Sequence, residues 1–185
     1  MGISADQARQ TLAAAELVCP GAAISEAVRR MAGEISARLQ DSNPLVLAVM
    51  RGSVVFAGQL LPQLAFPLEF DYLDVTRYGD TTRGGEIVWK VSPGTAVSGR
   101  TVLVLDDILD AGHTLAAIRD RLLSAGAREV YCAVFADKET GHSKPVTADF
   151  VGVRLPNRYV FGFGMDVNGA WRNLPAIYAL RHGEG

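Results

Sequence analysis

The stretch VLVLDDILDAGHT, residues 102–114, is the part of the sequence that decides the fold. It begins with four apolar residues, and three aspartates and a glycine follow, at Asp106, Asp107, Asp110 and Gly112. Apolar residues then recur at helical spacing over residues 115–123. A buried apolar strand that leads through a tight turn into a helix is typical of α/β proteins, in which parallel strands alternate with helices. The stretch therefore predicts an α/β fold.

The rest of the chain shows the same alternation of short apolar runs and helical patterns. Helical spacing predicts further helices at residues 5–17, 24–39 and 54–64. Apolar runs too short for independent helices predict strands at residues 45–50, 68–75, 101–105, 130–135 and 159–163, and the alternating residues 86–91 predict a strand with one exposed face. We expect one domain over residues 1–185, with N-terminal helices in 1–42 and a core at about 43–180. Its centre would be a mainly parallel, twisted sheet flanked by helices.

Composition and charge exclude several classes of protein. The chain has 185 residues, of which 49% are hydrophobic and 21% charged, as in ordinary globular domains and unlike disordered segments. Its formal net charge is -2 and no basic run occurs, so we expect neither nucleic acid nor membrane as a partner. Cys19 and Cys132 lack metal-ligand spacing, and the sequence shows no 18-residue apolar run and no signal-peptide pattern. We therefore expect a cytoplasmic location.

Polar residues follow the predicted strands at the points where the strands end. These residues are 51–53, 76–78, 106–114, 137–138 and 164–166. In an open parallel sheet the ligand binds at the carboxyl ends of the strands. We therefore expect these segments to meet around one site.

The turn that follows the aspartates has the features of a phosphate site. The N–H groups of residues 111–114 open the next helix, where unsatisfied donors and the helix dipole favour an anion. Gly112 allows the backbone to approach a phosphate closely. Carboxylates beside a phosphate suit sugar hydroxyls or a divalent metal. The stretch therefore predicts a phosphorylated sugar bound with Mg²⁺.

Two acidic residues, two apolar residues, Asp, a small residue, Gly, a variable residue and Thr make up residues 106–114. This order resembles the phosphoribosyl-diphosphate-binding motif of the purine phosphoribosyltransferases, and the resemblance extends from about residue 45 to residue 178. It is closest to the hypoxanthine-guanine phosphoribosyltransferases. The resemblance implies a type I phosphoribosyltransferase fold with a small hood and a mobile flap. It also implies purine salvage, in which 5-phosphoribose passes from phosphoribosyl diphosphate to N9 of hypoxanthine or guanine, giving IMP or GMP and pyrophosphate.

The resemblance also implies roles on the sugar-phosphate side of the site. Asp106 and Asp107 match the acidic pair that holds the ribose hydroxyls, directly or through Mg²⁺. The cradle of ribose and 5′-phosphate is matched by Asp110, Ala111, Gly112, His113 and Thr114. Asp110 also matches the general base that accepts the proton of purine N7, a role that requires hydrogen-bond reach of that proton.

Further matches concern the purine, the pyrophosphate and the flap. Lys138 matches the donor to the 6-oxo group, Tyr159 the ring that stacks on the purine, Val160 the backbone that contacts its edge, and Asp166 a further magnesium ligand beside the base. Arg51, Gly52 and Arg172 match the pyrophosphate contacts, with a cis non-proline peptide bond at the Arg51 loop. Thr76, Arg77, Tyr78 and the glycine-rich residues up to 85 match the flap. Family members are commonly dimers or tetramers, so the resemblance implies a homodimer or homotetramer.

This chain departs from the family pattern at three positions. Ala111 replaces a common threonine in the phosphate cradle, Arg77 replaces a serine before the flap tyrosine, and Asp106 replaces a glutamate.

The sequence does not rank hypoxanthine, guanine and xanthine as substrates, and a xanthine-preferring enzyme is one alternative. A non-catalytic sensor of phosphoribosyl diphosphate is another, although such a sensor would not need Lys138 and Tyr159. A phospho-acceptor domain of flavodoxin-like topology would also place acidic residues at strand ends, but it would not need Arg172.

Overall fold

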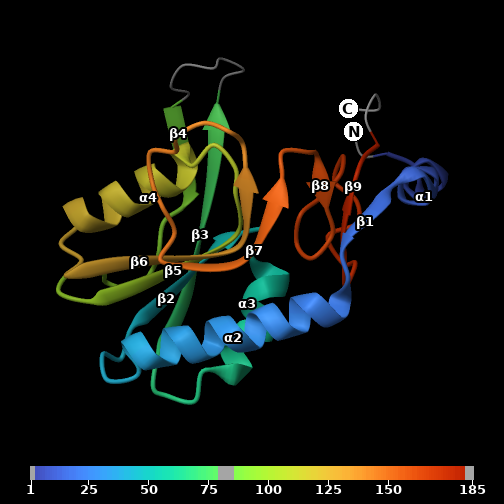
Figure 1. The fold of residues 1–185 in the computed structure, drawn as a ribbon. Helices are drawn as coiled ribbons and strands as arrows, with labels where there is room; N and C mark the ends of the chain where they lie inside the picture. The colour runs from blue at the N-terminus through green and yellow to red at the C-terminus, as the bar shows by residue number, and fades with distance from the viewer. Residues whose placement is uncertain (1–2, 79–85, 182–185) are drawn as a thin grey trace.

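The computed structural model describes residues 3–78 and 86–181, and for residues 77, 78 and 86 only the backbone is described. Its centre is a six-stranded sheet with the strand order β4-β3-β2-β5-β6-β7 (Figure 1). The strands are β2 (Leu45–Met50), β3 (Glu69–Tyr78), β4 (Glu86–Val91), β5 (Thr101–Leu109), β6 (Glu129–Glu139) and β7 (Phe150–Pro156). All neighbouring pairs are parallel except β3 and β4. The predicted α/β fold with a mainly parallel sheet is confirmed.

Helices cover both faces of this sheet. On one face lie α2 (Gly21–Leu39), α3 (Val54–Leu60) and the short 3-10 helix η1 (Leu61–Gln63), and α4 (His113–Ser124) lies on the other (Figure 1). Successive residues of β2 alternate between the two cores: Val46 and Ala48 join the cluster with α2 and α3, whereas Leu45 and Leu47 join the cluster with α4. Burial on both faces explains why the central strands are continuous apolar runs.

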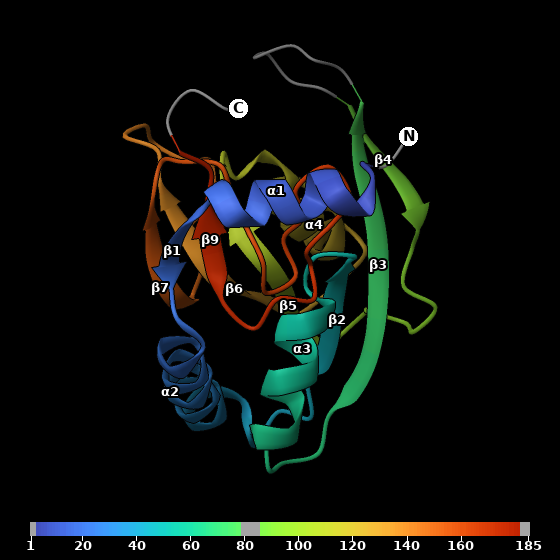
Figure 2. The ribbon, with the colours of Figure 1, turned by 90° about the vertical axis from the view of Figure 1, so that its right-hand side faces the viewer.

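A second, three-stranded antiparallel sheet lies beside the main sheet. It contains β1 (Glu16–Cys19), β9 (Ile177–Ala179) and β8 (Val160–Phe161), in the order β1-β9-β8. Helix α1 (Ala5–Ala14) lies next to this sheet (Figure 2). The indole N–H of Trp171 donates to the carbonyl of Ala8 at 2.6 Å, which ties α1 to the loop between β8 and β9. This second sheet forms the hood that the family resemblance implied.

Three element predictions were wrong. The helix expected at 5–17 ends at Ala14, because the next residues pair with β9 as β1. Residues 159–163 do not add a strand to the main sheet, since only Val160–Phe161 is a strand and it pairs with β9. The edge strand β7 was missed, because Gly152 and Arg154 interrupt its apolar pattern and Pro156 ends it.

The central strand β5 extends beyond its apolar run. It was expected to end at residue 105, but its pairing with β6 continues to the pair Leu109↔Asp137. Asp106 and Asp107 are therefore held in the strand itself, and Asp110 is the first residue after it. The carboxyl edge of the sheet thus has a fixed backbone where the acidic residues lie.

Gly152 provides a test of how closely β7 packs on the main sheet. A Cβ atom there would lie 2.4 Å from the carbonyl oxygen of Phe135 and 3.1 Å from Sδ of Met31 in α2. We predict that Gly152→Ala lowers the free energy of unfolding by about 1–3 kcal/mol, because the backbone must shift. Urea unfolding measures this change.

The matched control is Gly33→Ala, on the exposed side of α2, where a Cβ atom would meet nothing within 4 Å. This substitution should raise the free energy of unfolding by up to about 1 kcal/mol, because alanine favours a helix over glycine. Equal effects of the two substitutions would contradict the close packing of β7.

Candidate active site

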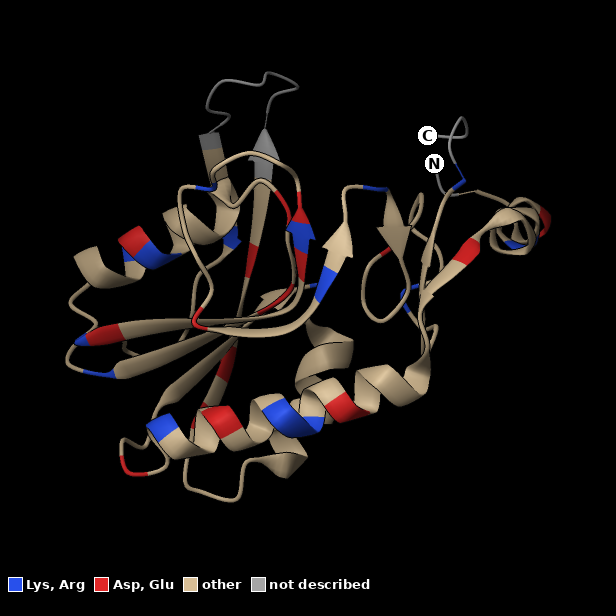
Figure 3. Cartoon of the chain, viewed as in Figure 1, with Lys and Arg blue, Asp and Glu red and all other residues tan. Residues whose placement is uncertain are grey.

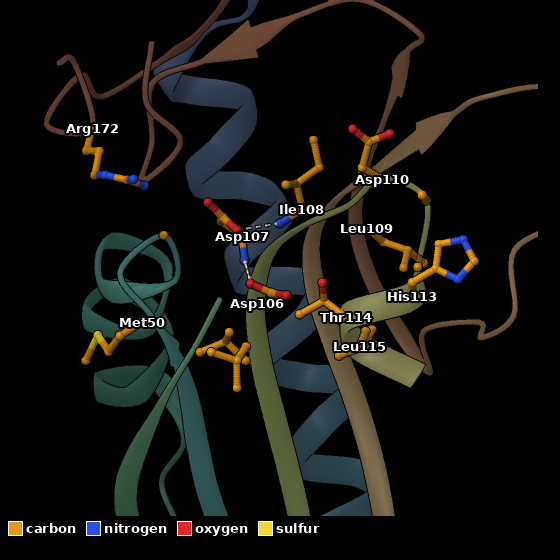
Figure 4. A pocket seen from close by; sticks show the side chains of 15 residues that line it. Met50, Asp106, Asp107, Ile108, Leu109, Asp110, His113, Thr114, Leu115 and Arg172 are labelled. Atoms are coloured by element: carbon orange, nitrogen blue, oxygen red, sulfur yellow. Dashed lines mark hydrogen bonds between the residues drawn. The ribbon is translucent and has the colours of Figure 1, made fainter. Parts of the chain in front are cut away.

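Two adjoining cavities lie at the carboxyl edge of the main sheet. The first has a volume of about 400 Å³ and is lined by the end of β2, the end of β5, the turn into α4 and Arg172 (Figure 4). The second has a volume of about 220 Å³ and is lined by Lys138 and Tyr159 and, among others, by Val160 of the hood. Asp107, Ile108, Asp110 and Arg172 line both cavities. Four of the five predicted strand-end segments therefore contribute lining residues to these cavities, and the fifth, residues 76–78, contributes none among the side chains that the structure describes.

The turn into α4 presents a helix N-terminus to the first cavity. Helix α4 begins at His113, two residues earlier than predicted, and its N-cap is Gly112 with a φ of 82°. Residues 110–115 all line the cavity, including the predicted cradle residues Ala111 and Thr114. The first N–H groups of a helix have no acceptor within the helix, and the helix dipole favours an anion there. The turn is therefore suited to bind a phosphate group.

Asp106, which is buried, and Asp107, which is half-buried, form an acidic pair at the end of β5. Asp106 is 9% exposed, and its Oδ1 accepts the backbone N–H of Asp107 at 2.9 Å. Burial, followed by the charge of Asp107, raises the pKa of Asp106 well above the ordinary aspartate value. Burial also raises the pKa of Asp107, although a hydrogen bond with Asp106 and the charge of Arg172 act in the opposite direction. Hydroxyl donors or a cation would stabilise the charged form of this pair.

Asp166 lies in a different arrangement from the one expected of a shared metal ligand. Its Oδ1 accepts a hydrogen bond from Nη2 of Arg172, and its Oδ2 accepts the N–H of Gly169 at 2.7 Å. Arg172 also donates to the carbonyl of Gly164 at 2.7 Å. Within residues 3–78 and 86–181, no three His, Cys, Asp or Glu side chains come together as a metal site. Asp106, Asp107 and Asp166 therefore do not form one three-carboxylate cluster.

Three chain segments meet at very close range beside Asp107. A Cβ atom on Gly52 would lie 1.9 Å from Oδ2 of Asp107, and one on Gly164 would lie 2.0 Å from the carbonyl oxygen of Gly52. The peptide bond between Met50 and Arg51 is cis, as the resemblance implied. Gly52 lines the first cavity, whereas the side chain of Arg51 is exposed and is not among the lining residues. Sequence reasoning missed the contact between Gly52 and Gly164, because neighbouring backbones leave no pattern in the sequence.

An ion pair between Lys138 and Asp110 lies in the second cavity. Nζ of Lys138 donates to Oδ2 of Asp110 at 2.8 Å, and the Lys138 side chain is only 11% exposed. Tyr159 is half exposed, and its hydroxyl donates to the carbonyl of Asp166 at 3.3 Å. Burial and the nearby Asp166 carboxylate raise the pKa of this hydroxyl. The structure thus brings Asp110, Lys138, Tyr159 and Val160 together, as predicted.

The remaining predicted residues lie at the edge of the site. His113 is exposed at the start of α4 and lines the first cavity (Figure 4). Thr76, Arg77 and Tyr78 form the end of β3, which pairs with β4. The rest of the predicted flap, residues 79–85, lies outside the described residues. Sequence reasoning did not single out Lys144, whose ammonium group contacts the backbone beside the site, at the carbonyls of Leu109 and Lys138.

Comparisons with known proteins agree with this geometry. The family model for the phosphoribosyl transferase domain matches residues 20–168. The hypoxanthine-guanine phosphoribosyltransferase of Bacillus subtilis is 33% identical over 159 residues, which cover 85% of this chain and 88% of that protein. That of Lactococcus lactis is 37% identical over 151 residues, with 80% and 82% covered. The bifunctional protein TilS/HprT of Listeria innocua is 35% identical, and this chain spans about a quarter (24%) of its length.

Solved structures show the same fold. A hypoxanthine phosphoribosyltransferase from Trypanosoma cruzi, in a ternary substrates complex, has a TM-score of 0.85 at 27% identity, with 92% of this chain and 97% of that chain covered. A hypoxanthine-guanine-xanthine phosphoribosyltransferase has a TM-score of 0.78 at 30% identity, with 90% and 94% covered. The family model, the relatives and the fold together show that this chain belongs to the phosphoribosyltransferase family, within its hypoxanthine-guanine phosphoribosyltransferase group.

Proposed function

We propose that this chain transfers 5-phosphoribose from phosphoribosyl diphosphate to N9 of hypoxanthine or guanine, releasing pyrophosphate in a purine salvage reaction. Membership of the family gives the class of reaction. The observation that carries the proposal is the pair of adjoining cavities, one with a helix N-terminus and acidic residues and one with Lys138 and Tyr159. Asp110 and Arg172 line both cavities, so the sugar and the base would meet between them.

The first cavity would hold the phosphoribosyl group. In this proposal the N–H groups of residues 111–114 bind the 5′-phosphate, and Asp106 and Asp107 accept hydrogen bonds from the ribose hydroxyls. Arg172 and the backbone around Arg51 and Gly52 would bind the pyrophosphate. A guanidinium offers two parallel donors to phosphate oxygens, and a donor that stabilises the departing anion lowers the barrier to its release.

The second cavity would hold the purine. Lys138 and Asp110 present a donor and an acceptor side by side, with 2.8 Å between Nζ and Oδ2. On an oxopurine, the 6-oxo acceptor and the N7–H donor are neighbours on one edge of the ring, so the pair complements that edge. Asp110 would accept the N7 proton as the bond from N9 to ribose forms. The ring of Tyr159 would stack on the base, while the backbone of Val160 contacts its edge.

The acidic pair also suits magnesium. Mg²⁺ is commonly held by one or two protein carboxylates together with substrate oxygens and water, so a three-carboxylate cluster is not required. Asp106 and Asp107 fit this role, because burial without a cation disfavours their charged forms. Asp166 already forms an ion pair with Arg172, so it would contribute less directly to magnesium binding. Bound Mg²⁺ would neutralise charge on the departing pyrophosphate.

We also propose a homodimer or homotetramer. Its support is an apolar surface on β3, where Phe70 and Tyr72 share one face of the strand and are 46% and 44% exposed. Light scattering measures the mass of the assembly.

Figure 3 shows basic and acidic residues interspersed along α2 and α4. That nucleic acid is not a partner stays a prediction. Within the described residues, no helix is both long and apolar enough to cross a membrane. The cytoplasmic location stays a prediction for cell fractionation to test.

The reaction itself is tested by measuring nucleotide and pyrophosphate formation from phosphoribosyl diphosphate with hypoxanthine, guanine, xanthine or adenine. We expect turnover with hypoxanthine or guanine and its loss when a chelator removes magnesium. Turnover with xanthine alone would identify a xanthine-preferring enzyme. Binding of phosphoribosyl diphosphate without turnover of any base would instead favour the sensor.

Lys138→Ala tests how the base is selected. Loss of a hydrogen bond from a charged donor costs about 1.5–3 kcal/mol, so the preference for hypoxanthine over adenine in kcat/KM should fall roughly tenfold or more. Competition between the two bases measures this ratio. An unchanged preference would show that another group contacts the 6-oxo position.

Asp110→Asn tests the general base. The amide keeps the size of the side chain but cannot accept the N7 proton, so kcat should fall about 100-fold or more. Binding of IMP, measured by calorimetry, should change by only a few fold, because no proton is transferred in binding. A kcat equal to that of the parent protein would show that Asp110 is not the general base.

Asp106→Asn tests the cost of the acidic pair to stability. A carboxyl group with a raised pKa in the folded state keeps its proton there while the unfolded chain loses it, so the protein loses stability as pH rises above the ordinary value of 3.8. Without ligand, the variant should therefore unfold at higher urea concentration than the parent near neutral pH, and the two should converge in acid. Parallel stability curves from about pH 3 to pH 8 would contradict this account.

A further inference from the structure

Lys144 lies in the loop between β6 and β7 and forms three hydrogen bonds. Its Nζ lies 2.7 Å from the carbonyl oxygen of Leu109, 2.5 Å from Oδ1 of Asp137 and 2.6 Å from the carbonyl oxygen of Lys138. An ammonium group has three N–H donors, so all three are used. The side chain is only 13% exposed, so these bonds are made largely out of contact with solvent. Lys144 is thus firmly held at the carboxyl edge of the sheet.

The three acceptors of Lys144 belong to β5, which leads into the proposed base Asp110, and to β6, which carries the proposed 6-oxo donor Lys138. Leu109 ends β5 and immediately precedes Asp110 (Figure 4), whereas Asp137 and Lys138 lie near the end of β6. Regular pairing between these strands ends at Leu109↔Asp137. The ammonium group of Lys144 therefore joins the two strands where their own backbone pairing stops.

Packing supports the same connection independently of the hydrogen bonds. A Cβ atom on Gly112 would lie 3.3 Å from both Cβ of Lys144 and Cδ of Pro145. The turn into α4, which would bind the 5′-phosphate, thus packs against the segment that carries Lys144. Lys144 is not among the residues that line either cavity of the site in the described part of the chain, and it instead lines a third cavity of about 390 Å³. Its contacts with the site are therefore made through other residues.

We propose that Lys144 is a positioning residue, which fixes Asp110 and Lys138 relative to each other by binding the backbone beside each of them. The separation of these two side chains determines how well they match the 6-oxo group and N7 of an oxopurine. This inference rests on the proposed function. Misplacement of a catalytic group by about 1 Å can reduce turnover 100-fold, so a residue that holds the backbone can control the rate without contacting substrate.

The test uses Lys144→Met. Methionine keeps an unbranched side chain of similar length but lacks the three N–H donors of the ammonium group. We expect faster amide hydrogen exchange in residues 109–114 and 137–140 of the ligand-free protein. We also expect kcat with hypoxanthine to fall about 10- to 100-fold, and the preference for hypoxanthine over adenine to weaken. KM for phosphoribosyl diphosphate should change by less than about threefold, since α4 still provides the phosphate turn.

Arg29→Met, on the exposed side of α2, is the matched control and should leave exchange and turnover unchanged. Unchanged exchange in the two segments of Lys144→Met would overturn the proposal. An equal increase throughout β5 and β6 would also overturn it, because this indicates a general loss of stability. If the parent protein transfers phosphoribose to no base, the proposed function fails, while the exchange measurement still decides whether Lys144 holds the two segments.

Discussion

The burial of β5 on both faces is the constraint on which the rest of the structure depends. This strand lies between β2 and β6, and its side chains alternate between a core under α2 and α3 and a core under α4. Helices on both sides fix its direction and leave only its carboxyl end open to the cavities. Asp106 and Asp107 lie at that end, so their positions are set by the packing of the whole sheet. The costly burial of Asp106 beside the half-buried Asp107 is possible because the surrounding strands cannot easily rearrange.

The hood is joined to this strand by contacts between backbones. Gly52, Asp107 and Gly164 come so close that a single added carbon atom on either glycine would overlap its neighbour. Arg172 follows in the same hood loop and reaches both the carbonyl of Gly164 and the carboxylate of Asp166. The position of the Arg172 guanidinium therefore depends on Gly52 and Gly164, which have no side chains. Electrostatic stabilisation of a departing anion needs such preorganised donors.

The parts of the fold that could be predicted are those in which a local pattern is also the cause of the structure. Strand β2 has the predicted bounds because its six residues must all be apolar to be buried on both faces. Strand β1 was missed because it is short and Leu17 is half exposed, so its pairing with β9 replaces a helix without any change in hydrophobic pattern. Residues 106–114 were predicted as a unit because they are contiguous. Lys144 was not, because two of its three partners are backbone carbonyls, which every residue possesses.

The bond between Trp171 and Ala8 has a consequence for how the chain can be altered. The family match begins at residue 20, so α1 lies outside it, yet the indole of Trp171 is held by a carbonyl of that helix and Trp171 directly precedes Arg172. Removal of α1 would leave this indole N–H without its acceptor and would free one side of the loop that carries Arg172. The chain should therefore not be shortened within α1, and a fusion partner should not cover the side of α1 that contacts Trp171.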